Sequence, residues 1–164
     1  NEKMYDLLAT AEGAPEGAGS GGLTISEENG TVHVKGLTKM IVNNEEEALN
    51  LLFEGETNRA MASHQLNRNS TRSHCVFTVF VESRSRVESS EKVTRGKLNL
   101  VDLAGSERIK KTGSDGVILQ EAMYINKSLT FLEQVVLALS ERNRDHVPYR
   151  QAKLTYYLSL NASF

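Results

Sequence analysis

The stretch Leu98-Asn99-Leu100-Val101-Asp102-Leu103-Ala104-Gly105-Ser106-Glu107 decides the fold of this 164-residue chain. Its apolar residues predict a strand over 98–101, which places the Asp102 carboxylate at the strand end. A small residue and Gly105 follow at once, so a backbone amide without a side chain is able to approach a terminal phosphate. Asp102 is a hard oxygen ligand suited to holding Mg²⁺ through water. A buried strand that ends in a helix-capping Asp and a turn glycine has the same pattern, so the motif alone leaves both interpretations open.

A second polar stretch, residues 67–74, has the sequence Asn-Arg-Asn-Ser-Thr-Arg-Ser-His and lies directly before another apolar run. Residues 75–81 are apolar on both faces, which predicts a strand covered from both sides. Two adjacent hydroxyl groups in 67–74 are able to offer one oxygen to a metal and one donor to a phosphate. Arg72 has a planar fork that suits a bidentate carboxylate partner such as Glu107. If the two strands pair antiparallel, both polar stretches meet at one end of the sheet.

N-x-x-S-T-R-S-H followed by D-L-A-G-S-E resembles the switch I and switch II pair of kinesin motor domains. Myosins carry a similar hydroxyl-hydroxyl-arginine switch, but the histidine and the Gly-Ser-Glu favour kinesin. The resemblance extends from Asn1 to about Thr155 and implies an α/β P-loop NTPase motor fold, with a central mixed sheet flanked by helices. The expected domain is a partial kinesin motor domain over 1–164, incomplete at both ends, with a divergent end at about 156–164.

The resemblance also implies a microtubule motor that uses ATP and Mg²⁺ and couples hydrolysis to movement. The expected catalytic pair is Arg72 and Glu107, which closes the site and orders the attacking water. Magnesium is expected at Asp102 and Thr71, largely through water. The residues expected to contact the nucleotide are Asn67, Ser70, Thr71 and Gly105.

A long amphipathic helix is predicted from residue 118 to residue 139, because apolar residues alternate there at spacings of four and three. A core-facing stripe explains this pattern better than a coiled-coil seam, given the limited length. The stripe consists of Ile118, Ala122, Ile125, Leu129, Leu132, Val136 and Leu139. The opposite face, which is expected to be free for a partner, carries Tyr124, Asn126, Lys127 and Ser128.

Basic groups lie on both sides of this helix. Another helix is predicted to begin near Pro148, with Arg150 and Lys153 three residues apart on one face. Each basic group alone is typical of a solvated surface, but their succession favours an acidic partner. In kinesins the corresponding segments grip tubulin, and the matching run here is Tyr-Ile-Asn-Lys-Ser-Leu at 124–129. The residues expected to bind tubulin are Arg108, Lys110, Lys111, Asn126, Lys127, His146, Tyr149, Arg150 and Lys153.

Three further elements follow from local patterns. Segments 23–25 and 31–34 flank Asn29-Gly30, which predicts a β-hairpin. Residues 44–54 are predicted to form a helix that starts with a capping box of Asn44 and Glu47 and ends at Gly55. Residues 82–96 are charged and Ser-rich, which predicts a solvated excursion between the two strands.

Composition narrows the class of protein. The net charge of −2 gives no sign of nucleic-acid binding, and the single cysteine excludes an internal disulfide. No apolar run approaches the ~18 residues that a membrane helix needs, so a cytosolic globular protein is expected. The kinesin resemblance implies a location on the microtubule cytoskeleton. The run N-R-N-S-T-R-S-H-C-V-F-T most resembles kinesins of cilia and flagella, which implies that location.

The only Gly-Lys pair, at 96–97, is followed by Leu98, so these residues contain no Walker A loop. ATP turnover by this chain alone is therefore not expected. A non-catalytic tubulin-binding module is the main alternative to a piece of an ATP-driven motor. Two further alternatives are a myosin-like motor and a purely structural α/β fragment. The first leaves the Gly-Ser-Glu run unexplained, and the second leaves the paired switch motifs unexplained.

Overall fold

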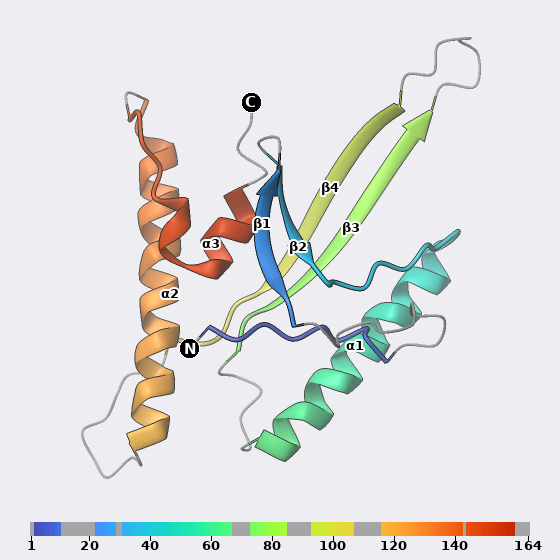
Figure 1. The fold of residues 1–164 in the computed structure, drawn as a ribbon, viewed down its shortest axis with the longest axis horizontal. Helices are drawn as coiled ribbons and strands as arrows, with labels where there is room; N and C mark the ends of the chain where they lie inside the picture. Colours follow the sequence, from blue (N-terminus) through green and yellow to red (C-terminus); the bar gives the residue numbers. More distant parts are fainter. Residues whose placement is uncertain are drawn as a thin grey trace.

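The computed structural model describes residues 2–10, 22–28, 31–66, 73–84, 93–106, 116–142 and 144–159. The elements are β1 (Thr24–Glu28), β2 (Thr31–Lys35), α1 (Glu45–Leu66), β3 (Cys75–Arg84), β4 (Val93–Asp102), α2 (Gly116–Ser140), the 3₁₀-helix η2 (Tyr149–Gln151) and α3 (Lys153–Leu158). In the described residues the strands form two antiparallel pairs, β1–β2 and β3–β4. Helices α2 and α3 flank these pairs on one side and α1 on the other (Figure 1). The α/β class is thereby confirmed.

The predicted hairpin is confirmed as β1–β2. Its register runs from Thr24 opposite Lys35 to Glu28 opposite Thr31. The Lys35 Nζ lies 2.9 Å from a Glu28 oxygen, so the two strands also share an ion pair. The expected turn residues, 29 and 30, lie outside the described part of the chain.

The antiparallel pairing of β3 and β4 is also confirmed, with Cys75 opposite Asp102 at one end and Arg84 opposite Val93 at the other. Both strands are longer than predicted, and the expected excursion over 82–96 is wrong at each end. A backbone ladder does not require apolar side chains, and the opposed Glu82 and Arg95 stabilise it through an ion pair of 2.8 Å.

The expectation that residues 75–81 are covered from both sides is also wrong within the described residues. Phe80 and Val81 are exposed, as are Leu98 and Leu100 on the neighbouring strand. The described helices cover only part of this ribbon, which explains why its apolar side chains remain accessible to solvent.

Helix α1 begins with the predicted capping box. The Glu47 amide donates to the Asn44 Oδ1 at 2.8 Å, and a Glu47 carboxylate oxygen accepts from the Asn43 amide at 2.8 Å. The predicted end at Gly55 is wrong, because the helix continues to Leu66. Gly55 is buried, and a Cβ there would lie 3.8 Å from the Leu8 side chain. A glycine at this position allows the preceding segment to pack closely on the helix.

Helix α2 spans the predicted region, but the face that it buries differs from the prediction. The buried positions are Ile125, Ser128, Val135 and Ala138, whereas Val136 and Leu139 of the expected stripe are exposed. Ser128 was expected on the free face, and its burial corrects that expectation. Side chains at 116–119, 121 and 122 lie outside the described set. Relative to the predicted stripe, the buried face is shifted by about one residue, because α3 packs against the helix. Hydrophobicity alone does not encode that contact.

The predicted second helix is divided into η2 and α3. Ala152 between them is extended, with φ −135° and ψ 151°, so Arg150 and Lys153 do not share a continuous helical face as expected. Thr155 of α3 is fully buried, and its hydroxyl lies 2.6 Å from the Tyr149 carbonyl oxygen. Tyr157 links α3 to β3 through a 2.7 Å hydrogen bond to Thr78. None of the helices that the structure describes is long and apolar enough to cross a membrane.

Candidate functional site

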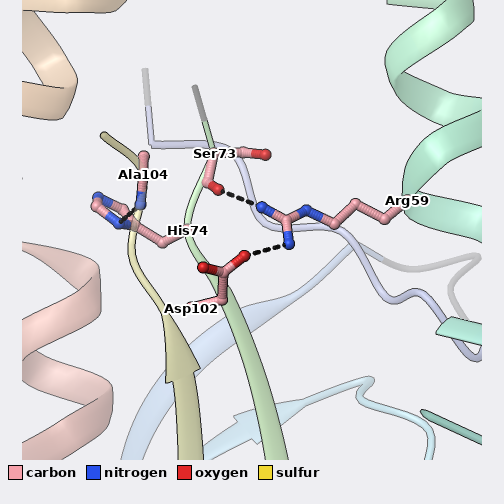
Figure 2. A network of polar contacts seen from close by, with 5 residues as sticks. All are labelled: Arg59, Ser73, His74, Asp102 and Ala104. Carbon is pink, nitrogen blue, oxygen red and sulfur yellow. Dashed lines mark hydrogen bonds and ion pairs between the residues drawn. The ribbon is translucent and has the colours of Figure 1, made fainter. Parts of the chain in front are cut away.

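Two loop segments converge where β3 begins and β4 ends. The register that places Cys75 opposite Asp102 brings Ser73 and His74, which precede β3, next to Leu103 and Ala104, which follow β4. Figure 2 shows Ser73, His74, Asp102 and Ala104 together with Arg59, which reaches in from α1. The predicted meeting of the two polar stretches at one end of the strand pair is confirmed for the described residues.

Arg59 joins the two segments. Its Nη1 lies 2.6 Å from the Asp102 Oδ2, and its Nη2 donates to the Ser73 carbonyl oxygen at 3.0 Å. The Arg59 side chain is 21% exposed and the Asp102 side chain is 67% exposed, so the ion pair has a protected cation and a solvated anion. Arg59 thus links α1 to the end of β4 and to the segment that precedes β3 (Figure 2).

No pattern in the sequence predicts a role for Arg59. It lies 43 residues from Asp102, and no short motif joins the two. The available signal was a single arginine that precedes the switch-like stretch, and the predicted helix end at Gly55 left it outside a helix. Its position becomes meaningful only because α1 continues past that glycine.

His74 makes two hydrogen bonds through opposite ring nitrogens. The Ala104 amide donates to the Nδ1 at 3.0 Å, and the Nε2 lies 2.7 Å from the Ser128 Oγ. Burial lowers the pKa of the His74 imidazole below its ordinary value, although the Glu2 and Asp102 carboxylates act in the opposite direction. The ring therefore favours its neutral form, in which one nitrogen accepts and the other donates.

The predicted phosphate-side residues are only partly described. Asp102 lies at the end of β4, and Gly105 follows three residues later in an exposed loop. Among the described residues, none comes within 4 Å of the position that a Cβ at Gly105 would occupy. The remaining predicted residues of this group lie outside the described part of the chain: Asn67, Ser70, Thr71, Arg72 and Glu107.

Asp102 fits a magnesium ion held through water. Its carboxylate is largely solvated, and the Arg59 contact engages the Oδ2. The described residues contain no cluster of three or more His, Cys, Asp or Glu that would hold a metal by direct ligands. A single exposed carboxylate suits an ion that keeps most of its hydration, which is the usual behaviour of Mg²⁺.

The predicted tubulin-binding residues are also divided between described and undescribed segments. Arg108, Lys110 and Lys111 lie outside the described residues. Asn126 and Lys127 are on α2, and the Lys127 Nζ lies 5.6 Å from the centre of the Phe131 ring. The others are in or beside η2 and at the start of α3: His146, Tyr149, Arg150 and Lys153.

A shallow cavity of about 350 Å³ lies between the β1–β2 hairpin and the segment 146–151. Arg150 lines it and is ion-paired with Glu27 of β1 at 2.7 Å. The Arg150 hydrogen bond, with a second from the Tyr156 hydroxyl at 3.1 Å, lowers the pKa of Glu27 below its ordinary value. Arg150 is therefore already charge-compensated within the chain.

Known proteins with similar sequences are kinesins. A family model described as the kinesin motor domain matches residues 1–162. The chain is 54% identical to the kinesin-like protein KIF9 of Mus musculus over 158 residues and 49% identical to the kinesin-like protein KLP1 of Chlamydomonas reinhardtii over 158 residues. Each alignment covers 96% of this chain and 20% of the relative, so the chain spans about a fifth of their length.

Solved structures give the same result at the level of the fold. A structure described as that of a fast kinesin superposes with a TM-score of 0.71 at 41% identity and covers 84% of this chain and 39% of that chain. The motor and motor homology domain of Kar3Vik1 superposes with a TM-score of 0.78 at 31% identity and covers 99% of this chain and 40% of that chain.

Proposed function

The chain belongs to the kinesin motor domain family, and from this premise we propose that it forms part of a microtubule motor that couples ATP hydrolysis to movement. In this proposal it supplies switch I, switch II and much of the tubulin-binding surface. The observation that carries it is the convergence of the segments around Ser73 and Asp102 at one end of β3–β4, joined by Arg59.

On the nucleotide side, each residue has a role suited to its chemistry. Asp102 and Thr71 would hold Mg²⁺ largely through water, and the ion would neutralise charge on the phosphates. Asn67, Ser70 and the backbone of Gly105 would contact the nucleotide. Arg72 and Glu107 would form a bidentate ion pair that closes the two loops, orients the attacking water and excludes bulk solvent.

On the partner side, Lys127 of α2 and the basic residues of the segment 146–153 would attract acidic tubulin. Lys127 and Lys153 have exposed positions, and Asn126 precedes Lys127 on the same helix. Long-range attraction would speed association, and salt would screen it. The cellular location in this proposal is the microtubule cytoskeleton, and the switch I sequence favours cilia or flagella.

The test compares ATP binding and turnover in the full-length protein with those of Arg72→Ala and Glu107→Ala. The ion pair forms in the closed state, so its loss should leave nucleotide affinity nearly unchanged and slow hydrolysis by roughly 100-fold or more. Arg84→Ala is the control, because Arg84 is an exposed arginine at the far end of the same strand pair.

Hydrolysis at the wild-type rate in either switch variant would contradict the assigned role. Microtubule binding without any nucleotide turnover by the full-length protein would refute the motor. It would instead support the alternative of a non-catalytic tubulin-binding module.

A further inference from the structure

His74 lies in an unbroken series of hydrogen bonds that crosses three segments. The series runs from the Ala104 amide to the His74 Nδ1, from the His74 Nε2 to the Ser128 Oγ, and from the Ser128 Oγ to the Ile125 carbonyl oxygen. The three distances are 3.0, 2.7 and 2.7 Å. The imidazole is the only side chain in this series that touches two other segments, and Figure 2 shows its bond to Ala104.

The direction of every bond in the series follows from one donor. A backbone amide only donates, so the His74 Nδ1 must accept from Ala104. The proton of the neutral ring is then on Nε2, which donates to the Ser128 Oγ. The Ser128 hydroxyl in turn donates to the Ile125 carbonyl. Each donor in the series has one acceptor. Reversal of the ring tautomer would break the Ala104 bond and would require the Ser128 hydroxyl to turn from the Ile125 carbonyl to the His74 Nε2.

Burial makes this arrangement costly to break. Ala104, Ser128 and Ile125 are 4%, 5% and 6% exposed, so water has little access to groups released from the series. A buried donor left without an acceptor is destabilising, which favours concerted movement of the linked groups over separation.

One linked segment carries residues proposed to contact the nucleotide, and the other carries residues proposed to contact tubulin. Ala104 lies between Asp102 and Gly105 on the nucleotide side, and Ser128 follows Lys127 on the tubulin side. We propose that His74 is a positioning residue whose imidazole couples the loop 103–106 to helix α2, so that a displacement of one segment displaces the other. The mechanical part of this inference rests on the proposed function, whereas the coupling itself does not.

The first test is a local measurement in the full-length protein: hydrogen–deuterium exchange at the Ala104 amide, resolved to single residues by mass spectrometry. Ser128→Ala removes the acceptor of the ring proton without touching Ala104. We expect Ala104 to exchange about fivefold faster, the factor that corresponds to one lost neutral hydrogen bond. Ser140→Ala is the matched control, because the Ser140 hydroxyl also donates to a carbonyl three residues earlier, that of Leu137, at 2.7 Å.

The second test separates coupling through the ring from general loosening of α2. In His74→Asn the amide oxygen replaces the Nδ1 as the acceptor for Ala104, but no group extends to Ser128. Ser128→Ala should then have no effect on Ala104 in the His74→Asn background. His74→Gln, which keeps a donor for Ser128 and loses the Nδ1 acceptor, should abolish the effect in the same way and replaces His74→Asn if that variant does not fold.

An unchanged Ala104 exchange rate in Ser128→Ala, or an equal increase with and without the histidine, would overturn the proposal. The mechanical arm measures the ratio of microtubule-stimulated to basal ATP turnover, which Ser128→Ala should lower about fivefold and Ser140→Ala should not change. Absence of microtubule stimulation in the wild type would refute the proposed function, while the exchange measurements would still decide whether the coupling exists.

Discussion

Replacement of Arg59 by Met should loosen the end of the β3–β4 pair at which the two switch-like segments meet. The contacts of Arg59 with the described residues there include the 2.6 Å ion pair with Asp102 and the 3.0 Å hydrogen bond to the Ser73 carbonyl oxygen. Met keeps most of the apolar stem of the side chain and removes the charge, so the change isolates these polar contacts.

The two contacts contribute unequally. The Asp102 side chain is 67% exposed, so solvent screens the ion pair and limits its contribution to less than about 1 kcal/mol. The Ser73 bond has a charged donor on a side chain that is 21% exposed, and it contributes about 1.5 kcal/mol. Arg59→Met should therefore cost about 2 kcal/mol locally, and Asp102→Asn, which leaves the Ser73 bond, less than about 1 kcal/mol.

Hydrogen exchange of the amides near Cys75 and Asp102 in the full-length protein is the assay. A cost of about 2 kcal/mol corresponds to roughly 30-fold faster exchange in Arg59→Met, whereas Asp102→Asn should give about fivefold or less. The control is Arg95→Met, which removes the comparable 2.8 Å ion pair with Glu82 on the same strands and should leave the Cys75 end unchanged. Equal acceleration by Arg59→Met and Asp102→Asn would refute the assignment of the larger contribution to Ser73.

Three further outcomes follow from the structure. Thr155→Val should accelerate exchange in α3, with a cost of about 1–3 kcal/mol, because its buried hydroxyl bonds the Tyr149 carbonyl at 2.6 Å; Thr155→Ser should not, and equal effects would contradict this reason. Lys127→Gln and Lys153→Gln should each weaken microtubule co-sedimentation and flatten its salt dependence more than Arg150→Gln, since Glu27 already compensates Arg150; equal losses would count against this difference. Below pH 6.5, the ordinary pKa of a histidine ring, the unfolded state binds more protons than the folded state, because the pKa of His74 is lowered on folding. The free energy of unfolding should therefore decrease as the pH falls, and it should decrease less in His74→Asn than in the wild type. Identical pH profiles would be inconsistent with the lowered pKa.

The sequence predicted those features whose physical cause is local. Asn44 and Glu47 are three residues apart, and the capping box that they form needs only the first turn of α1. The β1–β2 hairpin and the antiparallel pairing of β3 with β4 follow from alternation, turn residues and short connections. The switch-like motifs identified the family because their residue types and spacing are specific, and the family model confirms that assignment.

Where local rules failed, a contact from a distant segment was the cause. Gly55 is a typical helix end, but the close approach of Leu8 makes a glycine useful inside α1, and the helix continues. The stripe on α2 identified a helix and misplaced its buried face, since each residue turns the helix by about 100° and the contact with α3 sets the rotation.

By itself, then, the sequence determined the family, the order of the elements and the chemical character of Asp102 and Gly105. The tertiary structure alone decided which polar side chains from distant segments become partners. Arg59 meets Asp102 across 43 residues, His74 meets Ser128 across 54, and Arg150 meets Glu27 across 123. Periodicity describes the backbone pattern over a few residues. The contacts between these distant side chains depend on the angles at which helices and strands pack, and no spacing along the chain encodes those angles.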